Sequence, residues 1–136
     1  MPALIHEKTN QVLAEKIIFS HSFFKRIRGL LGYKEMPTHQ VMWIKPCASI
    51  HTFFMKFPID VIFVDENLCV KNVCTNIAPW TVLNSLGKKL SFFQYYIHPS
   101  TYDLKNYFQK TSVFEFQAGT LSKHSINKGD KLHVDS

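Results

Sequence analysis

A run of alternating side chains near the middle of the sequence has residue types that could bind a soft metal ion. Cys47, Ser49, His51, Phe53 and Met55 are spaced two residues apart. In an extended chain, side chains at this spacing point to one face. A thiol, an imidazole and a thioether on one face suit Cu(I). The same spacing is that of a buried strand in which these residues are core. We favour the core interpretation and predict no metal or other cofactor.

Cys47 and His51 also have the residue types of a nucleophile and its general base. A reactive thiolate needs an electropositive and partly exposed setting, and Lys45 is close in sequence. Residues four apart on a strand are separated by about 13 Å, however, which is too far for a hydrogen bond unless the chain bends. Cys47 and His51 are therefore only weak catalytic candidates.

Asp60 is the acidic residue whose position most needs an explanation. It lies inside the apolar run Ile59–Val64, where a carboxylate without partners would be costly. One interpretation is structural: the carboxylate accepts main-chain N–H groups and fixes a turn after Pro58. The functional interpretation is a polar pocket in which Arg28, His51 and Asp60 bind a small polar ligand. A pair of His51 and Asp60 acting in catalysis is a further alternative.

Glu115 is the fourth candidate for ligand binding. It lies on the alternating run 112–117, between Phe114 and Phe116. Alternation of this kind is typical of a strand with one solvated face. We expect Glu115 to face solvent, and the alternative is that it joins the polar pocket.

Residues 84–110 are rich in aromatic side chains and contain four lysines. Aromatic rings beside lysines could stack on single-stranded nucleic acid, or they could form a surface for a protein partner. The aromatic residues do not alternate cleanly, so the favoured interpretation is a strand or lid covered on both faces, with a short helix near Tyr102–Phe108. Nucleic acid is the least favoured partner.

The remaining pattern predicts a mainly β protein with one helix. Apolar or β-branched runs bounded by turn residues indicate strands. The expected strands are Ala3–His6, Val12–Ile18, Val41–Lys45, Ser49–Met55, Ile59–Val64, Leu68–Thr75, Ser112–Gln117 and Lys131–Val134. Apolar residues at helical spacing predict the helix over residues 20–31, ended by Gly32. A small sandwich or partly closed barrel of about seven short strands, with this helix packed against it, is the expected fold class.

The composition indicates one folded domain over residues 1–136. The chain is 46% hydrophobic and 14% aromatic, which argues against disorder. The net charge of +6 is spread along the chain, so it gives only weak support for binding to phosphates or an anionic surface.

The three cysteines are odd in number and include no CxxC motif, which indicates reduced thiols. The first 16 residues lack the apolar core of a signal peptide. No uncharged apolar run approaches the roughly 18 residues of a membrane span. We therefore expect a cytoplasmic protein.

Three blocks of this sequence resemble those of a widespread family, domain of unknown function 192 (DUF192). They are RGLLG at Arg28–Gly32, PCASIHTFFMKFPIDVIFVD at Pro46–Asp65, and VFEFQAGT at Val113–Thr120. The resemblance extends to about Val134. It implies a compact, mainly β domain with a helix against it, and it implies no chemistry because the family has no assigned activity. Many relatives are exported, whereas this chain shows no signal, and residues 84–110 exceed the short polar connection expected.

Together these observations favour a small, non-enzymatic β domain that binds a small polar ligand or a protein partner. The site is expected where the Pro46–Asp60 block meets Arg28. An enzyme that uses Cys47 or the His51–Asp60 pair is the second hypothesis, and a weak binder of nucleic acid or an anionic surface is the third.

Overall fold

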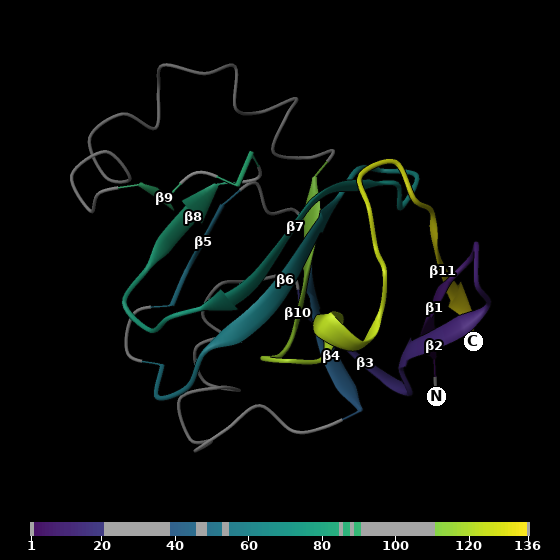
Figure 1. Ribbon diagram of the computed structural model, residues 1–136, viewed down its shortest axis with the longest axis horizontal. Helices are drawn as coiled ribbons and strands as arrows, with labels where there is room; N and C mark the ends of the chain where they lie inside the picture. Colours follow the sequence, from purple (N-terminus) through teal and green to yellow (C-terminus); the bar gives the residue numbers. More distant parts are fainter. Residues whose placement is uncertain are drawn as a thin grey trace.

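The structure is a computed structural model that describes residues 2–20, 39–45, 49–52, 55–84, 86–87, 89–90 and 111–135. Within these ranges the chain forms eleven strands and one short 3-10 helix. The strands are arranged in three sheets (Figure 1). The prediction of a mainly β domain is confirmed, although the strands are more numerous than the seven or so expected.

The central sheet has five strands in the order β3-β4-β10-β6-β7. Their bounds are Lys16–Ser20 (β3), Gln40–Ile44 (β4), Ser112–Gln117 (β10), Ile59–Val64 (β6) and Val70–Ile77 (β7). All neighbours pair antiparallel except β3 and β4, which are parallel. A parallel pair needs a crossover of a dozen or more residues, and residues 21–39 supply that length.

Two smaller sheets flank the central one (Figure 1). The first, ordered β11-β1-β2, consists of Leu132–Asp135, Ala3–His6 and Gln11–Ala14. The second, ordered β5-β8-β9, consists of Ser49–His51, Val82–Asn84 and Lys89–Leu90. Because the flanking sheets cover opposite faces of the central sheet, the protein is a three-layered β sandwich.

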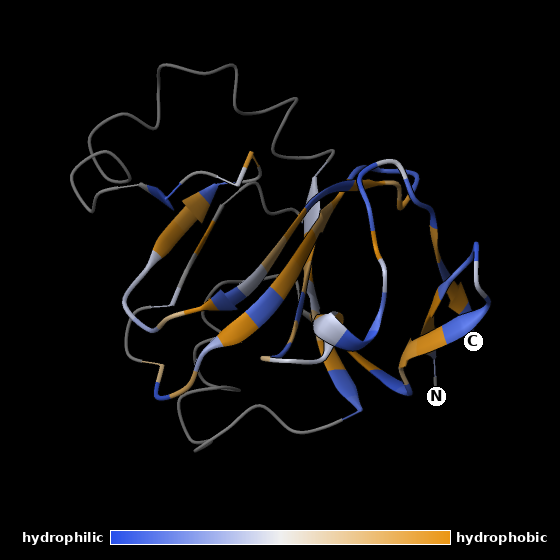
Figure 2. Cartoon of the chain, viewed as in Figure 1, coloured by the Kyte–Doolittle hydropathy of each residue, from blue (hydrophilic) through white to orange (hydrophobic). Residues whose placement is uncertain are grey.

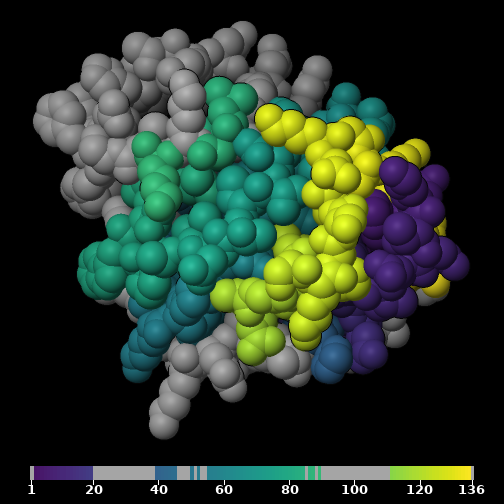
Figure 3. Space-filling model, viewed as in Figure 1, coloured from purple at the N-terminus to yellow at the C-terminus, as the bar shows by residue number. Residues whose placement is uncertain are grey.

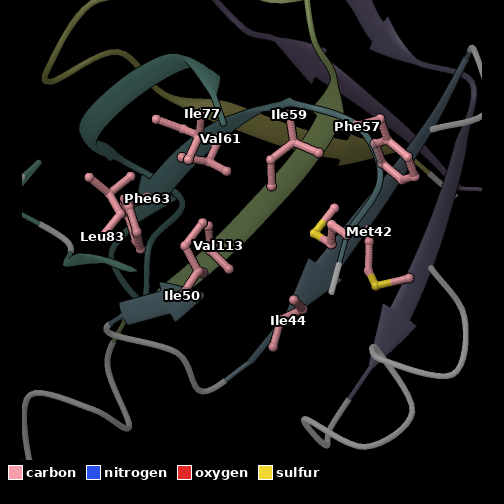
Figure 4. Packing of buried hydrophobic residues seen from close by; sticks show 11 residues of the cluster. Met42, Ile44, Ile50, Phe57, Ile59, Val61, Phe63, Ile77, Leu83 and Val113 are labelled. Carbon is pink, nitrogen blue, oxygen red and sulfur yellow. The ribbon is translucent and has the colours of Figure 1, made fainter. Parts of the chain in front are cut away.

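Two hydrophobic clusters fill the spaces between the layers. Cluster 1 lies between the central sheet and the β5-β8-β9 sheet (Figure 4), and it includes Ile59, Val61, Phe63, Val113, Ile50 and Leu83. Cluster 2 lies on the other face, against the β11-β1-β2 sheet, and includes Ile62, Val64, Phe114, Phe116, Leu4 and Leu132. Alternate residues of β6 and β10 therefore enter different clusters. All six residues of β6 are buried, which confirms the expectation of a strand covered on both faces, and apolar colour dominates its ribbon (Figure 2).

Two predicted strands are shorter than expected. The run Val12–Ile18 divides at Glu15, where the main-chain N–H groups of Glu15 and Lys16 both donate to the carbonyl of His39. This corner lets the chain leave one sheet as β2 and enter another as β3. The run Ser49–Met55 is a strand only to His51, because the Met55 N–H turns back to the carbonyl of Thr52 at 3.3 Å.

Several expected elements lie outside the described residues. These are the helix, apart from Ser20 at the end of β3, and the short helix near Tyr102–Phe108. In the described part of the chain, no helix has the length and apolar character required to cross a bilayer.

Candidate functional site

The Asp60 carboxylate is fully buried and accepts three main-chain hydrogen bonds. Its Oδ1 accepts the N–H of Asn76 at 2.8 Å. Its Oδ2 accepts the N–H groups of Gly119 and Leu121, each at 3.0 Å. Charge-assisted bonds of this kind offset the cost of burying a carboxylate. The structural interpretation of Asp60 as a main-chain acceptor is thus confirmed, but the turn it holds is Ala118–Leu121, not one after Pro58.

Asp60 also fixes an irregularity in the neighbouring strand. Ile59 pairs with Ile77, whereas Val61 pairs with Cys74. Two residues of β7 therefore oppose Asp60, which is the pattern of a β-bulge. Asn76 in this bulge has φ +52°, and Gly119 has φ +92°. Two of the three donors to Asp60 therefore come from residues with positive φ. Residues other than glycine and asparagine rarely adopt this backbone conformation.

Glu115 is buried on the opposite face of the central sheet. It is 0% exposed and pairs with Val61 of β6 on one side and Met42 of β4 on the other. Both of these neighbours belong to cluster 1. The expectation that Glu115 faces solvent is wrong, because β10 is covered on both faces and its alternation separates two cores.

The apolar surroundings of Glu115 come from two groups of side chains. In Figure 4, Phe63, Leu83, Ile50 and Val113 gather on one side, while Met42, Ile44 and Phe57 lie on the other. The register places Glu115 between Val61 and Met42, which is between these groups. A carboxylate in this position lies in a medium of low dielectric constant, where its interactions with hydrogen-bond donors and cations are stronger than in water.

Thr52 is a buried polar residue that the sequence pattern did not single out. Its hydroxyl donates to the carbonyl of Ala78 at 2.7 Å and accepts the N–H of Thr81 at 2.9 Å. The main-chain carbonyl of Thr52 also accepts the N–H of Trp80. Thr52 therefore holds the turn that carries the chain from the central sheet to β8, with Trp80 61% exposed at φ +63°.

The described residues include only part of the predicted pocket. Arg28 and Cys47 lie outside the described residues. The backbone of His51 pairs with Val82 in the β5-β8-β9 sheet, on the side of the central sheet away from the Asp60 carboxylate. Asp60 and Glu115 face different clusters. The pocket of Arg28, His51 and Asp60 stays a prediction.

The residues of the predicted soft-metal set lie partly outside the described residues. Met55 is buried in cluster 1, as the core interpretation expects. The Met55 N–H donates to the carbonyl of Thr52 at 3.3 Å, whereas Cys47 and Phe53 lie outside the described residues. No cluster of three or more histidine, cysteine or acidic side chains suited to a metal occurs in the described ranges. Cys69 and Cys74 are free thiols, and the cytoplasmic placement stays a prediction.

Fold and buried acids together describe a small three-layered β domain in which, among the described residues, each face of the central sheet has one buried carboxylate. Residues 4–134 match the profile of the DUF192 family, described as "Uncharacterized ACR". The chain belongs to this family. A UPF0127 protein of Pyrococcus horikoshii is 37% identical over 84 residues, which cover 58% of this chain and 70% of the relative. A UPF0127 protein of Pyrococcus abyssi is 33% identical over 87 residues, which cover 60% and 72%.

Two solved structures share the fold. One is a protein of Sinorhizobium meliloti, named only provisionally as a transcription regulator, with a TM-score of 0.66 and 15% identity over 98% of this chain and 91% of that one. The other is a protein of unknown function from Novosphingobium aromaticivorans, with a TM-score of 0.63 and 18% identity over 97% and 82%. At these identities the likeness concerns the fold alone.

Proposed function

We propose that this protein is a binding domain that holds a small ligand carrying an ammonium group, with the Glu115 carboxylate as its anionic contact. The observation that carries this proposal is the complete burial of Glu115 on the face formed by cluster 1. Full burial of a glutamate is uncommon in proteins. Buried acids occur at functional sites as well as in structural networks, and we assign Glu115 to the first group.

The neighbours of Glu115 suit a ligand with an apolar body. Met42 and Met55 belong to cluster 1 together with the aromatic ring of Phe57. Methionine side chains adapt their shape and are common at binding surfaces that accept varied ligands. An aromatic or aliphatic ammonium compound would match both the negative charge of Glu115 and the apolar side chains of cluster 1.

Asp60 is less suited to the same role. Both of its oxygens already accept main-chain hydrogen bonds. A ligand would have to displace at least one of these bonds, and each displaced N–H would remain buried without an acceptor. For this reason Asp60 is not the proposed contact.

Nuclear magnetic resonance titration tests the proposal. Benzylamine and benzyl alcohol have the same ring, but only benzylamine carries a charge at neutral pH. We expect benzylamine to shift amide signals of β4, β6 and β10, and Glu115→Gln to weaken its binding about tenfold or more, as loss of a buried ionic contact predicts. Benzyl alcohol should bind more weakly and be indifferent to the substitution.

Glu66→Gln is the matched control, since Glu66 is exposed in the turn between β6 and β7. It should leave benzylamine binding unchanged. Equal binding of benzylamine to the wild type and Glu115→Gln would refute the proposed contact, as would shifts confined to surface loops.

A further inference from the structure

A buried histidine at the end of β1 connects an exposed hydroxyl group to a carboxylate. The His6 side chain is 1% exposed. Its Nε2 lies 2.9 Å from Oδ2 of Asp130, and its Nδ1 lies 3.1 Å from Oγ1 of Thr9. Asp130 is 124 residues away in sequence, yet the N-terminal and C-terminal segments pack side by side on the surface (Figure 3).

The hydrogen bonds define which ring nitrogen carries the proton. An ionised carboxylate can only accept, so the proton shared with Asp130 belongs to Nε2 of His6. In the neutral imidazole, Nδ1 is then an acceptor. The Thr9 hydroxyl therefore donates to Nδ1, which is the arrangement in which a histidine can act as a general base toward a hydroxyl.

The Asp130 carboxylate, which is hydrogen-bonded to His6, is held ionised and in place. Oδ2 of Asp130 accepts the Asn127 main-chain N–H at 3.0 Å. That bond, followed by those with His6, lowers the pKa of Asp130 below its ordinary value. The Asp130 N–H donates to the carbonyl of Asn127 at 3.1 Å, and the neighbouring Lys131 carbonyl accepts the Glu7 N–H at 3.0 Å. This bond ties the carboxylate segment to the strand that carries His6.

The turn between β1 and β2 positions the hydroxyl. The Asn10 N–H donates to the His6 carbonyl at 2.8 Å and closes the turn, with Asn10 at φ +58°. Oγ1 of Thr9 also accepts the Gln11 N–H at 3.4 Å. A main-chain donor at this oxygen favours the negative charge that develops there when the proton moves to the imidazole. Thr9 itself is exposed, so a small reactant can approach it.

We propose that Thr9 is a nucleophile toward small carboxylic esters, with His6 as its general base and Asp130 as a positioning residue that orients the imidazole. Nothing in this proposal depends on Glu115, since the two sites lie on different layers of the molecule.

The chemistry balances without a cofactor. Thr9 Oγ1 forms a bond to the acyl carbon of the ester while its proton passes to Nδ1 of His6. The bond from the acyl carbon to the leaving oxygen breaks, and that oxygen takes the proton from Nδ1 to leave as an alcohol. The product is an ester on Thr9. Water then attacks this ester with the same nitrogen as base, and the acid is released with Thr9 restored.

Three elements supply charged groups that act on the imidazole or on its charged neighbours: Asp130 and His124 interact with His6, Lys8 acts on Asp130, and Lys123 acts on His124. Asp130 comes from the turn before β11, Lys8 from the turn between β1 and β2, and Lys123 and His124 from the 3-10 helix η1 (Leu121–Lys123) and its end. Burial, and then the charges of His6 and Lys123, lower the pKa of His124. The general base requires the neutral imidazole, because only then is Nδ1 of His6 an acceptor.

The experiment follows acetyl transfer from p-nitrophenyl acetate to the full-length protein. Release of p-nitrophenolate is measured from pH 5 to 9, and the acetylated residue is located by peptide mass spectrometry. We expect one acetyl group on Thr9 in the wild type and none there in Thr9→Val, which has nearly the same shape. Thr9→Ser should retain the reaction.

Two further variants distinguish a catalytic role of the His6–Asp130 contact from a purely structural role. Asp130→Asn should lower the rate constant for acetylation by about 10²-fold, a usual contribution of oriented acid–base catalysis, and should change the pH profile, which a purely structural contact would not do. Thr75→Val, at an exposed threonine of β7, is the matched control and should react as the wild type does. Acetyl groups on lysines alone would overturn the proposal, as would Thr9 acetylation at the same rate and pH profile in Asp130→Asn.

Discussion

Asp60 and Glu115 lie on paired strands of one sheet, and both are 0% exposed, but they face different layers. Asp60 points toward cluster 2, where three main-chain N–H groups converge on it. Glu115 lies among the apolar side chains of cluster 1. Burial alone therefore does not separate a structural acid from a candidate binding residue. Asp60 is identified as structural by its three main-chain donors, because main-chain donors cannot be exchanged for a ligand without disturbing the fold.

Of the substitutions that test this comparison, removal of the Asp60 carboxylate should lower the free energy of unfolding most. Asp60→Ala leaves three buried N–H groups without their acceptor, and we expect a loss of about 3–5 kcal/mol in the free energy of unfolding. Urea denaturation followed by circular dichroism measures this loss. A change below about 1 kcal/mol would mean that the Ala118–Leu121 turn is held by other contacts.

A matched pair of amide substitutions compares the two acids directly. Asp60→Asn keeps the shape, but places an NH₂ group against a main-chain donor, and we expect a loss of about 2 kcal/mol. Glu115→Gln removes a buried charge and retains a carbonyl acceptor, so the free energy of unfolding should change by about 1 kcal/mol or less. Denaturation curves of both variants at pH 7 give the difference.

The reverse order of these two effects would contradict our division of the acids. A large destabilisation by Glu115→Gln together with a small one by Asp60→Asn would make Glu115 the structural residue. The ligand site would then have to be sought elsewhere on the described surface.

Thr52 offers the same comparison with an uncharged side chain. It holds the turn leading to β8 as Asp60 holds the turn leading to η1. Thr52→Val removes one donor and one acceptor from a buried position, and we expect a loss of about 1–2 kcal/mol. Thr75→Val, at an exposed position, should change stability by about 0.5 kcal/mol or less. Equal effects of the two substitutions would show that the Thr52 hydroxyl does not hold this turn.

The sequence predicted well those parts of the fold that depend on local pattern. The continuous apolar run of β6 identified a strand buried on both faces. The Asp65–Asn67 turn was also predictable, and the Asp65 carboxylate accepts the N–H groups of Asn67 and Cys69. Such features need only the properties of neighbouring residues, and so they can be found from the sequence itself.

Features that depend on distant segments could not be predicted in the same way. The donors to Asp60 at Gly119 and Leu121 are 59 and 61 residues away. The alternation of Glu115 with phenylalanines is identical for a strand beside solvent and for one between two cores, because period-two alternation marks the faces but not what covers them. His6 showed no useful spacing because its partner Asp130 comes from the other end of the chain.

Asp130 provides the smallest effect that we predict, a dependence of stability on pH. In the folded protein the Asn127 N–H and then His6 lower the pKa of Asp130. In the unfolded chain the pKa of an aspartate is about 3.9. A lowered pKa means that the folded state binds the proton less readily than the unfolded state does. The stabilising contribution is therefore complete above about pH 5 and is lost as the pH falls through the folded-state pKa.

Comparison of Asp130→Asn with the wild type isolates this contribution. The wild type should be the more stable protein at pH 6, and the gap in free energy of unfolding should narrow as urea denaturation is repeated from about pH 5 down to pH 2. Asp135→Asn, at an exposed residue of β11, should show a smaller change over the same range. A gap that stays constant from pH 6 to pH 2 would mean that the Asp130 contacts stabilise the fold through shape and not through charge. In that case the ionised carboxylate required to orient His6 toward Thr9 would also be in doubt.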